Sequence, residues 1–261
     1  MANTPHRLVA ATAATALALV VGLLTTVLSS ADVTPSALGG SRAMISQYPW
    51  TVFLADTGGS QFCGGALVRG DKVVTAAHCV AGRLPADMRV VWGREDKQST
   101  AGAVVDVTRT WVDSDYRTPT SGSDVAVLTL RASVNSTYLP LATPFDAGLY
   151  APGTSATILG WGTAKSGGPA SRYLLKATVP ITSDATCQAA YPKYSSLSMV
   201  CAGFPEGGVD ACQGDSGGPI VAGGKLIGAT SWGRDCAPAG YPGVYSRVAS
   251  YYDLLSEQIG V

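Results

Sequence analysis

Short apolar runs rich in β-branched residues recur along the chain, and Gly, Pro, Asn or Asp usually separates them. Such runs predict the strands of an antiparallel barrel or sandwich. Helical spacing is convincing only near the C-terminus, at residues 249–259, where Tyr252, Leu255 and Ile259 fall on one face. We therefore predict an all-β fold with a short C-terminal helix. The clearest predicted strands lie at residues 50–54, 72–75, 89–92, 125–130, 154–159 and 243–248.

The N-terminal segment differs from the rest of the chain. Arg7 is followed by an apolar run at residues 8–28, and small residues follow in Ser29-Ser-Ala31. This pattern predicts a signal peptide over residues 1–31 and a secreted, extracellular protein. An uncleaved membrane anchor is the alternative, because a bilayer span needs about 20 apolar residues. The many Ala and Thr residues of the run lower its hydrophobicity and favour cleavage.

The remaining chain suffices for one large all-β unit or two small ones. The full sequence has a formal net charge of +0 and an isoelectric point of about 6.7, and no run of like charge appears. Nucleic-acid and membrane-surface functions need basic patches, so we expect no nucleic acid and, after signal cleavage, no membrane as partner. Residues 138–153, with three prolines, form the best internal linker.

Six cysteines are present, and all of them follow the leader. An even count in an exported chain favours disulfides over metal binding. Six cysteines allow 15 pairings, and their spacing alone does not choose among them. No Cys-x-x-Cys pair and no cluster of metal-ligating residues stands out, so we predict neither a metal site nor a cofactor.

Three residues suggest nucleophilic catalysis. Ser216 lies on a glycine-rich turn, and His78 is the only histidine outside the first six residues. A serine hydroxyl is a poor nucleophile until a base takes its proton, and in a chain without the leader His78 is the only imidazole available. Asp124, at the start of an apolar run, completes a Ser/His/Asp hypothesis.

The segments around these residues resemble the catalytic segments of the trypsin/chymotrypsin family of serine endopeptidases. They are Thr75-Ala-Ala-His-Cys79, Ser123-Asp-Val-Ala-Val-Leu128 and Gly214-Asp-Ser-Gly-Gly-Pro219, in that family's order. The resemblance runs from about Ala37 to the C-terminus. It implies two six-stranded antiparallel barrels, at about 37–145 and about 146–261, with the active site in the cleft between them.

The resemblance also implies the role of each catalytic group. Ser216 is the expected nucleophile, His78 the general base and then acid, and Asp124 the group that fixes the imidazole tautomer. The backbone N–H groups of Gly214 and Ser216 are the expected oxyanion hole. Ser231 matches a serine that lies beside the aspartate and on a segment that pairs with substrate.

The same resemblance implies the specificity. Asp210 matches the floor of the primary pocket, and a carboxylate there implies cleavage after Arg or Lys. Gly233 and Gly243 match wall positions that leave the pocket open for a long side chain. The chain departs from the family's usual pattern at Asp235, where glycine is usual before Cys236. A second interpretation keeps the chemistry and changes the specificity through this residue.

Three disulfides and several partners follow from the resemblance. Polypeptide substrates and proteinaceous protease inhibitors are the implied partners, and the protein is expected to be a monomer. Glu95 and Asp96 lie near a calcium-binding position of some relatives, but two adjacent acidic residues do not make a site. The implied pairs are Cys63–Cys79, Cys187–Cys201 and Cys212–Cys236.

Activation is the second departure from the pattern. Family members begin with Ile-Val-Gly-Gly or a close variant after processing, and the new amino group pairs with the aspartate before the nucleophile, here Asp215. This chain has Ala37-Leu-Gly-Gly40 there, which implies a pro-segment at 32–36 and a weaker apolar anchor. No Lys or Arg lies between Arg7 and Arg42, so activation by the enzyme's own tryptic specificity is not expected.

A non-catalytic binding module on the same fold is an interpretation from a different class. Such modules generally lose a member of the triad, whereas His78, Asp124 and Ser216 are all present. We therefore favour a secreted serine endopeptidase made as a precursor.

Overall fold

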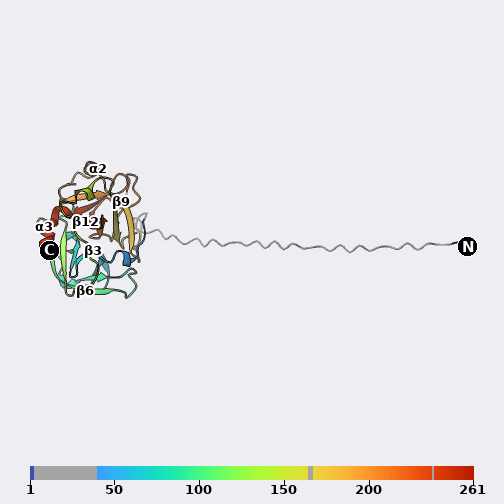
Figure 1. Ribbon diagram of the computed structural model, residues 1–261, viewed down its shortest axis with the longest axis horizontal. Helices are drawn as coiled ribbons and strands as arrows, with labels where there is room; N and C mark the ends of the chain where they lie inside the picture. The colour runs from blue at the N-terminus through green and yellow to red at the C-terminus, as the bar shows by residue number, and fades with distance from the viewer. Residues whose placement is uncertain (3–39, 164–166, 237) are drawn as a thin grey trace. The chain divides into compact units, whose positions relative to one another are not determined.

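The computed structural model describes residues 1–2, 40–163, 167–236 and 238–261. Residues 3–31 of the expected signal peptide, the expected pro-segment and Ala37 lie outside the described residues. All elements below belong to one unit, Thr34–Val261, and most of them are strands (Figure 1). No helix in the described ranges has the length and apolarity that a membrane crossing requires.

Six antiparallel strands close the first barrel, in the order β2-β3-β4-β7-β6-β5. Its interior is apolar, with Leu54, Leu67, Met88 and Leu128 fully buried. The strands are β2 (Thr51–Asp56), β3 (Gln61–Arg69), β4 (Lys72–Thr75), β5 (Met88–Trp92), β6 (Ala103–Val112) and β7 (Ala126–Leu130).

The second sheet has the order β1-β9-β8-β11-β12-β13-β10. An isolated bridge from Ile181, just after β9, to Ala202 in β10 joins the two ends of the six long strands. The strands are β1 (Ser41–Arg42), β8 (Ser155–Gly160), β9 (Leu175–Pro180), β10 (Met199–Ala202), β11 (Pro219–Ala222), β12 (Lys225–Trp232) and β13 (Gly243–Arg247).

Strand β9 illustrates how the sequence sets the burial. Leu175, Ala177 and Val179 are buried, while the residues between them are at least partly exposed. Side chains of a strand alternate between two faces, so every second residue of β9 enters the second core. Strand β1 pairs with β9 although it lies within the range expected for the first barrel. The family's two-barrel fold and the short C-terminal helix are confirmed.

An apolar cluster joins the two halves of the unit. It contains Val74 and Val127 from the first barrel, Leu226 from the second, and Leu255 and Ile259 from the C-terminal helix. The helix α3 begins at Tyr252, because the preceding residues of the predicted helix form a 3₁₀ turn. The helices are α1 (Ala77–Val80), α2 (Asp184–Ala190) and α3 (Tyr252–Ile259), and the described 3₁₀ turns are Ile45–Gln47, Pro85–Asp87, Pro119–Ser121, Ala147–Tyr150 and Val248–Tyr251.

The predicted linker does more than connect. The backbone N–H of Leu139 donates to the carbonyl of Leu67 in β3 at 2.9 Å, and Leu226 in β12 donates to Pro140 at 2.8 Å. The linker thus hydrogen-bonds to a strand of each barrel, and this fixes the two halves on which the candidate site depends.

Candidate active site

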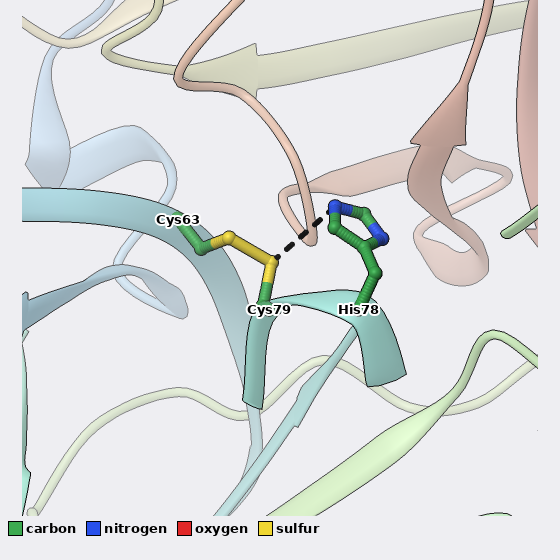
Figure 2. A group of neighbouring side chains, drawn as sticks. All are labelled: Cys63, His78 and Cys79. Carbon is green, nitrogen blue, oxygen red and sulfur yellow. Dashed lines mark hydrogen bonds between the residues drawn. A yellow bond between two sulfur atoms is a disulfide. The ribbon is translucent and has the colours of Figure 1, made fainter. Parts of the chain in front are cut away.

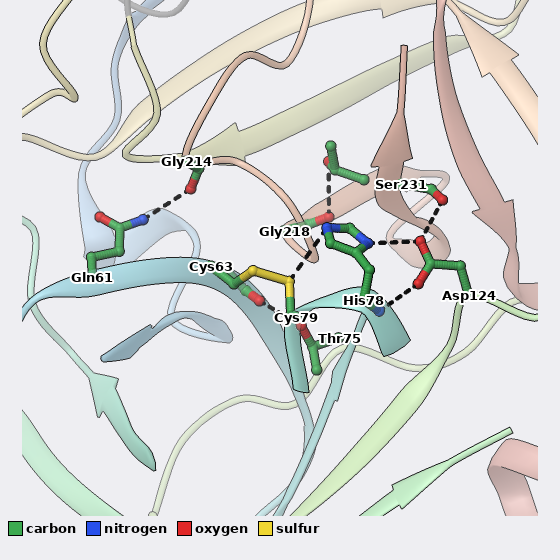
Figure 3. The surroundings of a disulfide bond; sticks show 11 residues. Gln61, Cys63, Thr75, His78, Cys79, Asp124, Gly214, Gly218 and Ser231 are labelled. Atoms are coloured by element: carbon green, nitrogen blue, oxygen red, sulfur yellow. Dashed lines mark hydrogen bonds and ion pairs between the residues drawn. A yellow bond between two sulfur atoms is a disulfide. The ribbon is translucent and has the colours of Figure 1, made fainter. Parts of the chain in front are cut away.

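His78 and Asp124 meet because their strands are neighbours. Thr75 at the end of β4 lies opposite Ala126 at the start of β7, so His78 and Asp124 emerge at the same end of the barrel. Asp124 Oδ1 accepts the backbone N–H of His78 at 2.8 Å, and Oδ2 lies 2.8 Å from His78 Nδ1 (Figure 3). Ser231 on β12 donates its hydroxyl to the same Oδ2 at 2.5 Å.

This arrangement fixes the proton on the imidazole. Asp124 is only 1% exposed, and its carboxylate is the acceptor that faces Nδ1 of His78. Nδ1 therefore carries the hydrogen, and Nε2 is left as the free base. The ring itself is partly exposed, so Nε2 is available to a substrate or to a nucleophile.

Ser216 is held against the segment that carries His78. The N–H of Gly64, next to Cys63, donates to the carbonyl of Ser216 at 2.7 Å. Gly217 has φ of +75°, and a Cβ there would lie 2.2 Å from Thr75 Oγ1. Only glycine fits so close an approach. Gly217 therefore allows residues 214–218, the serine turn, to pack against residues 75–79, which carry His78.

The Cys63–Cys79 disulfide lies directly beside the imidazole (Figure 2). Cys79 Sγ is 3.7 Å from Nε2 of His78. Both sulfurs are used in the disulfide and offer no thiolate, so this cluster is not a metal site. The other disulfides of the structure join Cys187 to Cys201 and Cys212 to Cys236.

Asp215 is buried behind the serine turn. Its Oδ1 accepts the N–H of Gly162 at 2.7 Å, and its Oδ2 accepts the N–H of Cys212 at 3.0 Å. A Cβ on Gly160 or Gly162 would lie 2.0 or 2.4 Å from the carboxylate oxygens, so both positions require glycine. Burial raises the pKa of Asp215 to about 6, and the charge of Lys97 acts in the opposite direction.

A pocket of about 230 Å³ opens beside Ser216, and Asp210 lies on its lining. Asp210 is 4% exposed, and its Oδ1 accepts from the N–H of Ala211 at 2.7 Å and from the hydroxyl of Tyr245 at 3.2 Å. Burial raises the pKa of Asp210 to about 7. A Cβ on Gly243 would lie 2.3 Å from Asp210 Oδ1, so a side chain there would displace the carboxylate.

Ser231, Gly233 and Asp235 also line this pocket. A Cβ on Gly233 would meet nothing closer than 3.9 Å, so this glycine leaves open space at the wall. Asp235 is exposed and has φ of 53°, a left-handed conformation that residues other than glycine seldom adopt. The pocket thus contains a buried carboxylate at Asp210 and an exposed one at Asp235.

Glu95 and Asp96 are engaged by arginines. Glu95 lies 3.6 Å from the Arg42 guanidinium, and its other oxygen accepts the N–H of Ile45. Asp96 receives two hydrogen bonds from Arg172, which are the main cause of its pKa of about 2. Two carboxylates already paired with guanidinium groups favour an inter-loop contact over a calcium site.

Sequence reasoning missed several groups that complete the site. Ser246 donates its hydroxyl to the carbonyl of Asp124 at 2.7 Å, and Tyr245 donates to Asp210. Gln61 donates to the carbonyl of Gly214 at 3.0 Å. These contacts join distant segments, and no local motif marks them. The structure joins His78 and Ser231 through Asp124, and it places Asp210, Ser216, Ser231, Gly233 and Gly243 around one pocket, while Ala37 lies outside the described residues.

Comparison with known proteins agrees with this geometry. A family model described as Trypsin matches residues 37–255. The chain is 55% identical over 222 residues to a curated protein named Trypsin from Saccharopolyspora erythraea, with 85% of this chain and 97% of that protein covered.

Two animal proteins are also similar. The chain is 37% identical over 229 residues to Trypsin 5G1 of Aedes aegypti, with 86% of this chain and 85% of that protein covered. It is 37% identical over 225 residues to Trypsin of Xenopus laevis, with 85% of this chain and 90% of that protein covered. The similarity extends over both barrels and all three catalytic segments.

Proposed function

The chain belongs to the trypsin family of serine endopeptidases, and from this premise we propose that it is a secreted enzyme, made as a precursor, that cuts polypeptides after Arg or Lys. The observation that carries the specificity is the buried carboxylate of Asp210 in the pocket that Ser216 also lines. A cation in that pocket would face an acceptor with few partners of its own.

In the proposed reaction, Ser216 Oγ attacks the scissile carbonyl carbon while its proton passes to Nε2 of His78. Asp124 stays ionised and accepts the hydrogen of Nδ1, which stabilises the imidazolium that forms. The N–H groups of Gly214 and Ser216 donate to the developing oxyanion. The proposal is supported by the 2.8 Å contact of Asp124 with His78 and by the glycine-dependent docking of the serine turn.

The tetrahedral intermediate formed by this attack collapses to an acyl-enzyme, which water then hydrolyses. The carbon–nitrogen bond breaks as His78 returns its proton to the leaving amine, and an ester remains on Ser216. Water attacks this ester with His78 again as base, and Ser216 leaves with the proton. The acyl product retains the Arg or Lys side chain beside Asp210.

Covalent labelling tests the catalytic assignment. Diisopropyl fluorophosphate should add one phosphoryl group to the processed protein, and peptide mass spectrometry should locate it on Ser216. His78→Ala should abolish the labelling, since the hydroxyl then lacks its base. An unlabelled wild-type protein would instead support the non-catalytic binding module.

A peptide library tests the specificity separately. We expect cleavage after Arg and Lys, because Asp210 supplies the counter-charge of the pocket. Asp235 is the observation that favours a second candidate, altered specificity, because it adds a carboxylate to the same lining. A preference for Phe or Tyr would contradict both versions, and a change of preference in Asp235→Gly would support the second one.

The precursor proposal concerns Ala37 and Asp215. A new amino group at Ala37 would pair with Asp215 and stabilise the neighbouring oxyanion-hole backbone, and the small Ala37 side chain would make this state only weakly favoured. Chains that start at Ala37 and at Asp32 should therefore differ in titratable active sites, and Ala37→Ile should raise the active fraction. Equal activity of the two chains would contradict the proposal.

A further inference from the structure

Lys97 is a half-buried lysine on the loop between β5 and β6, and it reaches toward the serine turn. Its backbone N–H donates to the carbonyl of Arg172 at 2.9 Å. Its Nζ donates to Oε1 of Gln61 at 2.9 Å and lies 3.5 Å from the carbonyl oxygen of Trp161. Among the described residues, no carboxylate lies within 4.0 Å of this ammonium, so amide oxygens receive its charge.

The contact with Gln61 links Lys97 to Gly214 in the serine turn. Gln61 accepts from Lys97 with its Oε1. Its Nε2 donates to the carbonyl of Gly214 at 3.0 Å, and Figure 3 shows this second bond. The ammonium fixes which end of the Gln61 amide faces Gly214, because only the oxygen can accept from Lys97. The donor is thereby aimed at the Gly214–Asp215 peptide, next to the proposed oxyanion hole.

The second contact continues to the carboxylate of Asp215. The carbonyl of Trp161 and the N–H of Gly162 belong to one peptide group. Lys97 approaches the carbonyl oxygen of this peptide, and the N–H of Gly162 in the same peptide donates to Asp215 Oδ1 at 2.7 Å. Hydrogen bonds in such a chain polarise one another, so the positive charge strengthens the bond that Asp215 receives.

Charge supports the same connection. Asp215 is 5% exposed, and desolvation opposes its ionisation. The positive charge of Lys97 lowers the pKa of Asp215, while burial lowers the pKa of Lys97. The two groups thus stabilise each other's charged forms through the intervening amides.

We propose that Lys97 is a positioning residue for peptide hydrolysis, which orients the Gly214–Asp215 segment through Gln61 on one side and the Trp161–Gly162 peptide on the other. It supplies Asp215 with positive charge from within the folded chain, in addition to any charge from a processed N-terminus. The proposal rests on the proposed function, because its effect is expressed through the oxyanion hole that this function requires.

Two assays distinguish an effect on the oxyanion hole from an effect on the pocket that Asp210 lines. Steady-state hydrolysis of an Arg amide substrate gives kcat and KM, and benzamidine binding reports the Asp210 pocket without the oxyanion hole. Lys97→Met should lower kcat at least about tenfold, less than the hundredfold or more for the outright loss of a donor. KM and the benzamidine Kd should change less than about threefold, and Lys97→Arg should restore most of kcat.

Two further variants complete the experiment. Lys72→Met is the matched control, because the Lys72 side chain is also largely buried, with 14% of it exposed, and donates to a side-chain oxygen, Thr129 Oγ1 at 2.9 Å. In the part of the chain that the structure describes, no hydrogen bond links Lys72 to the turn that carries Ser216. The kcat of Lys72→Met should equal that of the wild type. Gln61→Glu keeps an acceptor for Lys97 and removes the donor to Gly214, so its kcat should fall as in Lys97→Met.

The outcomes are distinguishable. A Lys97→Met protein with wild-type kcat would overturn the inference, as would an equal loss of kcat in Lys97→Met and Lys97→Arg together with a lower urea midpoint in both. If Lys97→Met does not fold, Gln61→Glu against the wild type gives the same decision. A wild-type protein that does not react with diisopropyl fluorophosphate would contradict the proposed function itself.

Discussion

Asp124 and Asp210 are both almost completely buried, but their carboxylates are partnered differently. Both oxygens of Asp124 accept hydrogen bonds, two from His78 and one from Ser231. Asp210 accepts two hydrogen bonds, both through Oδ1, and no described protein group donates to its Oδ2. The carboxylate beside the imidazole is thus satisfied within the protein, while the one in the pocket is not.

The difference separates two tasks of the site. A carboxylate with a complete set of donors has one orientation and holds its neighbour in one tautomer, as a proton-transfer step requires. A buried carboxylate with an open acceptor is costly in the free protein and gains most when a cation arrives. In the proposed function, the free energy lost in the free pocket would be recovered when an Arg or Lys side chain of the substrate binds.

The largest expected effect comes from removing a side chain that is proposed to act in proton transfer with Asp124. Ser216→Ala and His78→Ala should each lower kcat by roughly 10⁴- to 10⁶-fold, and the double variant should be little worse, because the groups act as a unit. Steady-state rate measurements on the purified wild type and variants check this. Wild-type activity in either single variant would exclude the mechanism.

The next largest effect is expected at Asp210, the carboxylate in the pocket. Asp210→Ser should lower kcat/KM for Arg and Lys substrates by about 2–5 kcal/mol, because the substrate cation then lies buried without a counter-charge. Substrates with an apolar residue at that position should lose much less. Paired peptide substrates that differ only there check the prediction, and an equal loss for both kinds would assign Asp210 a structural role instead.

The same carboxylate should make stability depend on pH. The pKa of Asp210 is raised from an unfolded value of 3.8 to about 7, so the folded state binds the proton more tightly than the unfolded state. Its stabilising contribution is complete below about pH 4 and is lost as the pH rises through about 7. Asp210→Asn should therefore gain stability over the wild type across this range, by about 1.4 kcal/mol per unit of pKa difference.

Urea unfolding of both proteins from pH 4 to pH 8 checks this. The comparison subtracts Asp215, whose pKa is also raised but which both proteins retain. A stability difference that does not vary with pH would show that the free pocket carries no such cost.

A smaller effect is expected when Asp124 loses one of its three hydrogen-bond donors. Ser231→Ala leaves Asp124 with its two bonds from His78 and removes the hydroxyl that donates at 2.5 Å. A hydrogen bond to a charged group contributes about 1.5–3 kcal/mol, so kcat should fall about tenfold or somewhat more. The pH profile of kcat should also move, since the imidazole loses part of its fixed environment. An unchanged kcat and profile would make this bond dispensable.

The sequence predicts both carboxylates and the residues of the three motifs, but not every group that contacts them. The catalytic segments and Asp210 lie in contiguous motifs, so their resemblance to the family brings His78, Asp124, Ser216 and Asp210 to attention directly. The C-terminal helix is also predictable, because Leu255 and Ile259 recur at helical spacing and both are buried. Its first turn is not, because apolar spacing does not distinguish a 3₁₀ turn from an α-helix.

The long-range contacts of Asp210 and of Gly214 are not predictable from local patterns. Tyr245 reaches Asp210 across 35 residues, and Gln61 reaches Gly214 across 153. The first contact depends on how the second barrel folds and the second on how the two barrels dock, and no single segment encodes either. The pairing of β1 with β9 is not predictable for a related reason, since two residues carry no periodic signal and tertiary pairing decides.

The ionisation of Asp210 during cation binding tests the contrast between the two carboxylates most directly. Benzamidine carries a permanent amidinium charge near neutral pH, and calorimetric titration at about pH 6.5 in two buffers of different ionisation enthalpy counts the protons exchanged. With the pKa of free Asp210 at about 7, binding should release a substantial fraction of a proton from the wild type and almost none from Asp210→Asn. Tight binding without proton release, or equal release from both proteins, would contradict the account.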